Sequence, residues 1–302
     1  MENYITLIAL FAGGYMLRRV PAFPRDAANS LNLFVIYVSL PAMVLYQIPS
    51  MHISAEMALP VAMPWLMVAA SAAAVYALSR ALGWDRKVTG TMLLLIPLGN
   101  TSFLGIPMIR GFLGERFISY AIIYDQFGTF LALSTYGAYV LAAYGEGARP
   151  ELRTLMRKII TFPPFIALAV ALSTRGLAYP PALVASLKTI AASLVPVVMV
   201  AIGFQFRLTV DRHHMAPLGA GLVMKLVLAP LLALGICLAI GAGGDAAMVS
   251  VFEAGMPPMV TAGALAIMGG LAGELAASLV GFGIILSFAS LPALHWALRL
   301  LP

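Results

Sequence analysis

Four ionisable side chains fall within strongly apolar stretches of this sequence: Asp125, Lys188, Lys225 and Glu253. An unpaired charge at the centre of a bilayer costs roughly 2.5 kcal/mol or more, so such residues usually have a function. A carboxyl group held there could take up and release a proton. We therefore predict proton or ion coupling through Asp125, Gln126, Glu253 and Lys225. The alternative is a buried ion pair between a carboxylate and Lys225 that supports only the fold, while Lys188 reads as a side chain that reaches the interface.

Two apolar stretches, residues 88–113 and 245–270, are each interrupted near the middle by a turn-forming sequence. The interruptions are NTSFLGIP at residues 100–107 and EAGMPP at residues 253–258, half the chain length apart. Unwound backbone is tolerated at membrane depth only where protein or a cavity shields it from lipid. Interruptions at corresponding places in two halves of a chain indicate the binding site of an inverted-repeat transporter.

Each interruption would present the N-terminus of a half-helix near the membrane midplane, where free N–H groups favour a negative ligand. A carboxylate could be held there without an arginine. The predicted substrate-binding residues are Asn100, Thr101, Ser102, Gly105, Gly255, Met256 and Thr261. The prolines Pro107, Pro257 and Pro258 have no N–H to donate and are interpreted as makers of the breaks. The alternative is that the polar side chains only tie down unwound backbone.

The elements that must position these residues are transmembrane helices. The chain has 302 residues, 62% of them hydrophobic and 10% charged, with a mean hydropathy of +0.97, which is typical of a polytopic membrane protein. The single cysteine, Cys237, excludes an intrachain disulfide and a cysteine metal cluster. No metal or cofactor is expected beyond a coupling ion, H⁺ or Na⁺. The predicted spans are residues 2–17, 30–49, 57–80, 88–113, 116–144, 159–175, 180–206, 216–241, 246–270 and 275–298.

Basic residues predict the orientation of these ten spans. Twelve Lys and Arg residues fall in loops on one side and four on the other, so the first side is cytoplasmic and both termini lie outside. No cleavable signal peptide is evident before the first span. Five spans per half give the halves opposite orientations. We predict a first five-helix repeat at residues 1–145, a cytoplasmic linker at 146–158 and a second, inverted repeat at 159–302; Pro41 and Pro196 occupy matching places in the two repeats.

Several segments resemble the auxin efflux carrier family in its bacterial form. They are residues 100–107, Tyr124-Asp125-Gln126, residues 195–203 and residues 253–258, and the resemblance extends over nearly the whole chain in order and spacing. It implies an all-α fold of ten transmembrane helices, shared distantly with bile-acid symporters and sodium/proton antiporters, in which broken helices four and nine cross. The long cytoplasmic loop of the plant carriers is absent, so regulation through such a loop is not expected.

The same resemblance implies transport of small organic anions, with malonate, other carboxylates and indole acids of the auxin type as substrates. It implies elevator-type alternating access, in which spans three to five and eight to ten form a transport unit that moves against a scaffold of spans one, two, six and seven. A homodimer through the scaffold and a location in the bacterial inner membrane are further expectations.

Other classes of function fit the sequence less well. An intramembrane enzyme is not expected, because the chain has no HExxH, GxSxG or DDxxD motif. A net charge of +6 does not indicate nucleic acid, because no dense basic patch accompanies it. A channel is disfavoured by the repeated broken helices. The alternative is a cation/proton antiporter of the same broad fold, which should cluster acids at the crossover, whereas in the sequence Asp125 stands alone.

Overall fold

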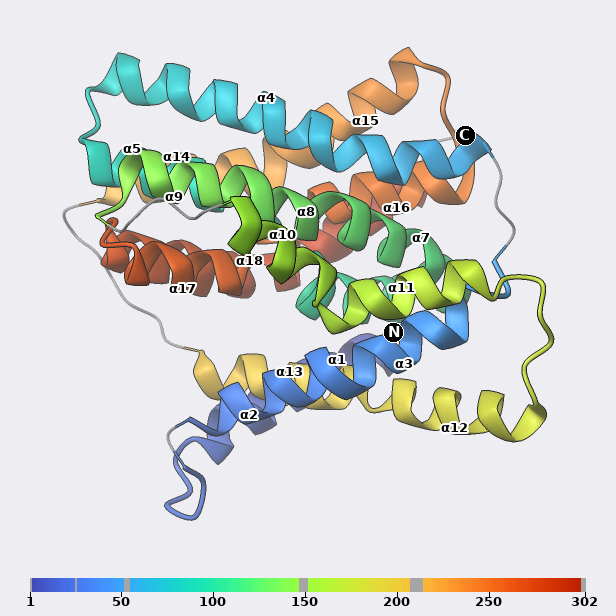
Figure 1. Cartoon of the computed structure of the whole chain (residues 1–302). Helices are drawn as coiled ribbons and strands as arrows, with labels where there is room; N and C mark the ends of the chain where they lie inside the picture. Colours follow the sequence, from blue (N-terminus) through green and yellow to red (C-terminus); the bar gives the residue numbers. More distant parts are fainter. Residues whose placement is uncertain (1, 25, 52–54, 147–151, 207–213, 300–302) are drawn as a thin grey trace. The chain divides into compact units, whose positions relative to one another are not determined.

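A computed structural model describes residues 2–24, 26–51, 55–146, 152–206 and 214–299, and within these ranges all regular structure is helical (Figure 1). Five helices in this part of the chain are long and apolar enough to cross a membrane: Ala27–Gln47, Ala55–Leu82, Pro181–Gln205, Met215–Ala239 and Gly273–Arg299. Ile5–Leu17 and Pro163–Ser173 are shorter apolar helices. The prediction of an all-α membrane protein is confirmed, and the ten-span inverted repeat stays a prediction.

The chain divides into two compact units, each built from three separate segments. Unit 1 comprises Met1–Ser54, Ser102–Ile122 and Met156–Phe206, and unit 2 comprises Ala55–Thr101, Ile123–Leu155 and Arg207–Pro302. Three helices contain residues of both units: η3 (Thr101–Gly105), α7 (Ile118–Ile123) and α10 (Leu152–Ile160).

Unit 1 packs its helices closely through small residues. Its elements are α1 (Glu2–Leu17), α2 (Ala27–Phe34), η1 (Val35–Ser39), α3 (Leu40–Gln47), α6 (Ile106–Phe112), η4 (Glu115–Phe117), α11 (Pro163–Ser173), α12 (Pro181–Ala192) and α13 (Leu194–Gln205). Helix α1 lies against α13, and α3 lies against α11 and α12. The α1–α13 pair is close because Gly14 faces the backbone of Val200 and Gly203 faces the backbone of Phe11.

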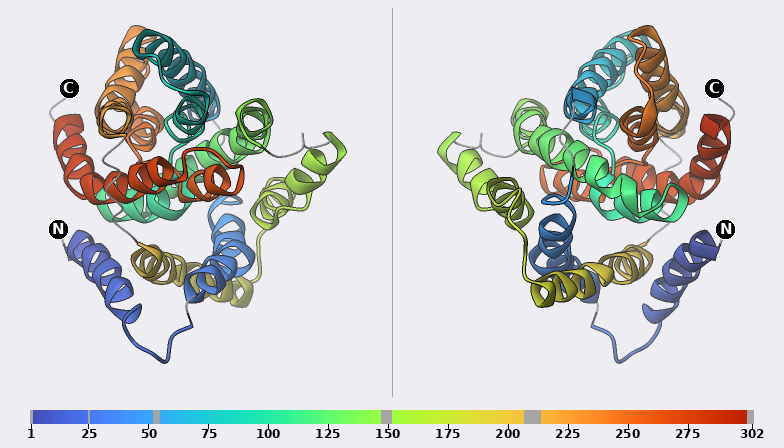
Figure 2. Two further views of the ribbon diagram at one scale, coloured as in Figure 1. Left: turned by 90° about the vertical axis from the view of Figure 1, so that its left-hand side faces the viewer. Right: turned by 90° about the vertical axis from the view of Figure 1, so that its right-hand side faces the viewer.

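Unit 2 is built around a buried helix, α5 (Arg86–Leu95). The other elements are η2 (Ala55–Met57), α4 (Ala58–Leu82), η5 (Tyr124–Thr129), α8 (Phe130–Ala132), η6 (Leu133–Gly137), α9 (Ala138–Tyr144), α14 (Met215–Val223), η7 (Met224–Leu228), α15 (Ala229–Ala239), α16 (Gly244–Ala254), α17 (Val260–Met268) and α18 (Gly273–Arg299). Every residue from Val88 to Leu95 is buried, and α4, α9, α17 and α18 pack around α5. The turned views show α16 beside both α4 and α15 (Figure 2).

Three π-helical segments in the chain share one sequence feature. Segments η1, η3 and η7 each end two residues before a proline, at Pro41, Pro107 and Pro230 respectively. Proline removes a backbone donor and its ring clashes with the carbonyl four residues earlier. A local widening from α to π geometry relieves that clash without ending the helix. The helices therefore continue past these prolines.

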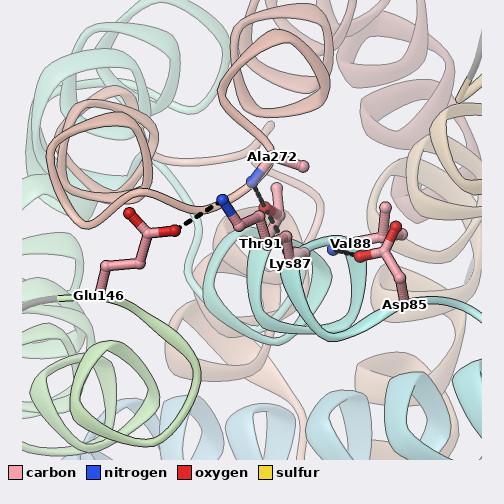
Figure 3. A network of polar contacts seen from close by, with 6 residues as sticks. All are labelled: Asp85, Lys87, Val88, Thr91, Glu146 and Ala272. Carbon is pink, nitrogen blue, oxygen red and sulfur yellow. Dashed lines mark hydrogen bonds and ion pairs between the residues drawn. The ribbon is translucent and has the colours of Figure 1, made fainter.

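A polar network fastens one end of unit 2 (Figure 3). Asp85 begins α5, because its Oδ1 accepts from the Val88 amide at 2.8 Å. One turn on, the Thr91 hydroxyl donates to the Lys87 carbonyl and accepts from the Ala272 amide at 3.0 Å. The Lys87 ammonium lies 2.7 Å from a carboxylate oxygen of Glu146. The start of α5, the segment after α9 and the turn before α18 are thus tied together.

Candidate functional site

The interruptions of two helices meet within unit 2. Gly99 and Pro258 form an antiparallel bridge. The Asn100 amide donates to the Pro257 carbonyl at 2.8 Å, and the Met259 amide donates to the Leu98 carbonyl at 3.0 Å. Each break therefore supplies hydrogen-bond partners to the other, which allows unwound backbone to be buried. We call this pairing of residues 96–100 with residues 255–259 the crossing.

The first break lies earlier in the chain than predicted. Helix α5 ends at Leu95, the unwound residues are 96–100, and Thr101 already begins η3. Pro107 lies in the first turn of α6, so its interpretation as the maker of this break is wrong. Pro97 is the proline inside the break, and Pro97-Leu98-Gly99 was the turn signal that sequence reasoning missed.

The second break follows the prediction. Helix α16 ends at Ala254, and residues 255–259 are unwound up to the start of α17 at Val260. Gly283 of α18 makes room for it, because a Cβ at that glycine would stand 2.6 Å from Cδ of Pro258. A glycine is therefore required where α18 passes the two prolines, and nothing in the sequence of α18 alone marks it.

Asp125 is buried and held by two side-chain donors. It lies in the π-helical segment η5 and is 1% exposed. The Thr101 hydroxyl donates to its Oδ1 at 2.6 Å, and Nε2 of Gln126 donates to its Oδ2 at 2.7 Å. Thr101 directly follows the first break, so its hydrogen bond to Asp125 connects η5 to the crossing. Short π-helical segments are frequent at functional sites, because the extra residue turns side chains that an α-helix would place elsewhere.

Lys225 and Glu253 lie close to the crossing from two other elements. Lys225 belongs to η7 and is 4% exposed, and its Nζ lies 3.2 Å from where a Cβ of Gly99 would stand. Glu253 is in the last turn of α16, where its carbonyl accepts from the Met256 amide of the second break. The Glu253 side chain is fully buried and interacts electrostatically with both Asp125 and Lys225. The absence of a side chain on Gly99 lets the ammonium approach the unwound backbone.

Several buried polar atoms around the crossing have no hydrogen-bond partner within the part of the chain that the structure describes. They are Nδ2 of Asn100, Oε1 of Gln126, Oγ of Ser250 and both carboxyl oxygens of Glu253. Buried polar atoms are nearly always paired, so a group of unpaired ones calls for a ligand, a water or an ion. Here both donors and acceptors are unpaired.

The structure brings together most, but not all, of the predicted site residues. Those in unit 2 that belong to the crossing or interact with it are Asn100, Thr101, Asp125, Gln126, Lys225, Glu253, Gly255, Met256, Pro257 and Pro258. Ser102, Gly105 and Pro107 belong to unit 1 on the helical run that follows the break. Thr261 is exposed on α17. The statement that Asp125 stands alone is wrong, because the fold places Glu253 within electrostatic reach of it.

Comparisons with known proteins place the chain among transporters. A family model described as membrane transport protein matches residues 1–295. A protein of Methanothermobacter thermautotrophicus described as an uncharacterized transporter is 28% identical over 296 residues, which is 96% of each chain. An uncharacterized transporter of Methanocaldococcus jannaschii is 28% identical over 214 residues, covering 67% of this chain and 68% of its own.

Proposed function

This chain belongs to the auxin efflux carrier family of membrane transport proteins, and we propose that it is a secondary active transporter of small organic anions. The substrates would be carboxylates such as malonate or auxin-like indole acids. The observation that carries this proposal is the position of the Lys225 ammonium against Gly99 in the crossing. A buried positive charge beside unwound backbone, with Nδ2 of Asn100 unpaired in the same break, suits a carboxylate.

The proposed architecture is the ten-span inverted repeat, with elevator-type alternating access between a transport unit and a scaffold. The division into compact units supports it, because unit 1 contains predicted spans one, two, six and seven and unit 2 contains spans three, eight, nine and ten. The segment Ser102–Ile122 departs from the scheme, since it belongs to unit 1 although the prediction assigned it to the transport unit. A homodimer, a bacterial inner membrane location and outward-facing termini remain part of this proposal.

A second candidate is a cation/proton antiporter of the same broad fold. The electrostatic interaction between Asp125 and Glu253 favours it, because paired buried acids can exchange a cation for protons. Lys225 disfavours it, because a resident ammonium beside these acids supplies the positive charge that a transported cation would otherwise bring.

Uptake into proteoliposomes distinguishes the two candidates. Radiolabelled malonate, further dicarboxylates and indole acetate are offered with a proton gradient or a sodium gradient, each imposed separately. Carboxylate accumulation that protein-free liposomes do not show supports the anion carrier. Cation-driven pH changes without carboxylate flux would support the antiporter and exclude our proposal.

A matched pair of variants tests whether the crossing is the site. Asn100→Ala removes an unpaired buried donor of the first break, so its KM for the transported carboxylate should rise. Asn29→Ala changes an exposed asparagine of α2 in unit 1, and its KM should match the wild type. Equal KM values for the two variants would remove Asn100 from the site.

A further inference from the structure

We infer that Glu253 is the group that takes up a proton when a carboxylate binds beside Lys225, while Asp125 stays ionised as a fixed counter-charge. This inference rests on the proposed function and names the coupling ion of the same site. Three residues carry it: Asp125, Lys225 and Glu253.

Asp125 is poorly placed to exchange a proton. Both of its oxygens are occupied, one by the Thr101 hydroxyl at 2.6 Å and the other by the Gln126 amide at 2.7 Å. Donors of this kind stabilise a carboxylate. Protonating Asp125 would remove the charge that both donors stabilise, and both donors are themselves buried, each 1% exposed. Asp125 therefore acts as a permanent negative charge.

Glu253 has the opposite surroundings. Neither of its oxygens has a hydrogen-bond partner among the described residues, although the side chain is fully buried. A buried carboxylate without donors is costly, and protonation removes that cost. The charged or titratable groups that interact with it are Asp125 and Tyr124 from η5 and Lys225 from η7. Of these, Lys225 alone favours its ionised form through its charge.

Lys225 also lies at the first break, where the substrate carboxylate would bind. Its Nζ lies against Gly99, and Nδ2 of Asn100, the next residue, has no partner within the described chain. The first break thus has a cation against Gly99 and an unpaired donor on the next residue. A carboxylate there would compete with Glu253 for the charge of Lys225.

Charge balance then couples the two binding events. When Lys225 holds Glu253 ionised in the free site, the charges of Asp125, Glu253 and Lys225 sum to one negative charge. When a carboxylate with one negative charge binds to Lys225, a proton from solution adds to a Glu253 oxygen and the sum stays the same. Binding without that proton would place two uncompensated negative charges in a buried site. Substrate and proton therefore each promote the binding of the other, which is the requirement for proton-coupled uptake.

The test compares Glu253→Gln with Glu274→Gln, an exposed glutamate of α18 in the same unit. The probe is indole acetate, which carries one negative charge over the pH range used. Binding is measured on purified protein at several pH values between about 6 and 8, where one linked proton changes affinity by up to about tenfold per pH unit. The wild type and Glu274→Gln should bind more weakly as the pH rises, whereas Glu253→Gln should bind with a flat profile.

Transport gives a second readout on the same variants. A proton gradient should drive accumulation by the wild type and not by Glu253→Gln, which should still exchange labelled for unlabelled substrate. A Glu253→Gln protein that keeps the wild-type pH dependence would overturn the inference while leaving carboxylate transport intact. A wild type that moves no carboxylate would overturn the proposed function as well.

Proton uptake by the wild type provides a check that does not depend on a variant's folding. A pH indicator in weakly buffered solution should report up to about one proton taken up per carboxylate bound. Carboxylate binding with no proton uptake would contradict the inference.

Discussion

Gly14→Ala should destabilise the protein strongly, although alanine is the better helix former. Gly14 lies on α1 where it meets α13, and an added Cβ would stand 2.1 Å from the carbonyl oxygen of Val200 and 2.8 Å from its carbon. Cβ atoms essentially never approach another atom within 3.0 Å, so the two helices must separate. The carbonyl belongs to a helix backbone and cannot turn aside. Overpacking of this kind costs roughly 1–3 kcal/mol.

The neighbouring glycine supplies the control. A Cβ at Gly13 would have nothing within 4 Å, and the residue has no left-handed backbone conformation to lose. Gly13→Ala should therefore raise the free energy of unfolding by about 0.5–1 kcal/mol, because alanine is the better helix former. The free energies of unfolding of these two Gly→Ala variants should thus differ by roughly 1.5–4 kcal/mol. Gly14→Ala should be less stable than the wild type and Gly13→Ala more stable.

The assay is thermal unfolding in detergent, followed by size-exclusion chromatography at a fixed heating time because membrane proteins often unfold irreversibly. Gly14→Ala should lose its folded peak at a lower temperature than the wild type, and Gly13→Ala should not. Since both glycines belong to unit 1, the folded fraction of each variant should keep the wild-type KM for its substrate. Equal stability of the two variants would refute the close approach of α1 to α13.

Three further substitutions test unit 2. Lys225→Met should raise the KM for a carboxylate about tenfold or more, because a charge-assisted contact is worth roughly 1.5–3 kcal/mol; uptake kinetics measure this, and an unchanged KM would contradict the role of Lys225. Asp125→Asn should lower the melting temperature, since an amide cannot accept from both Thr101 and Gln126, yet substrate binding should keep its pH dependence. Glu146→Gln should reduce the melting temperature slightly at neutral pH. The hydrogen bond from Lys87 and its charge hold the pKa of Glu146 below its usual range. The stabilisation from this pair is therefore complete above the pKa of Glu146 in the unfolded chain, and it is lost as the pH falls through the pKa of Glu146 in the folded protein. Both side chains are exposed, which keeps the effect small.

The sequence predicted the second break in place, because proline and glycine act locally. Residues 253–258 end α16 where predicted, since Gly255, Pro257 and Pro258 directly determine the backbone there. The composition of residues 100–107 predicts unwound backbone there, but the first break lies several residues earlier, at residues 96–100. The residues after Asn100 are helical, and the π-helical η3 accommodates Pro107. Pro97 thus lies within a break, whereas Pro107 follows a π-helical segment in a helix that continues.

The tertiary relations could not be predicted. Nothing local to residues 224–228 indicates that Lys225 approaches Gly99, because the contact joins segments far apart in the chain. The electrostatic interaction of Asp125 with Glu253 likewise depends on how η5 and α16 are placed in unit 2. The residue types were informative all the same, since the three ionisable residues that the sequence predicts to be functional, Asp125, Lys225 and Glu253, gather at the crossing.

The sign of the transported ion depends on Lys225 more than on the two acids. Without the ammonium, Asp125 and Glu253 would form a buried pair of negative charges, which a cation or protons must neutralise. When the Lys225 ammonium is present, its positive charge already neutralises the charge of one acid. Any arriving anion must then compete with the acids for that same positive charge. The small size of Gly99 makes this competition possible, because a Cβ there would stand 3.2 Å from the ammonium and 3.5 Å from Cβ of Met256. The proposed anion selectivity therefore rests on one lysine placed against one glycine, and not on the helix termini alone.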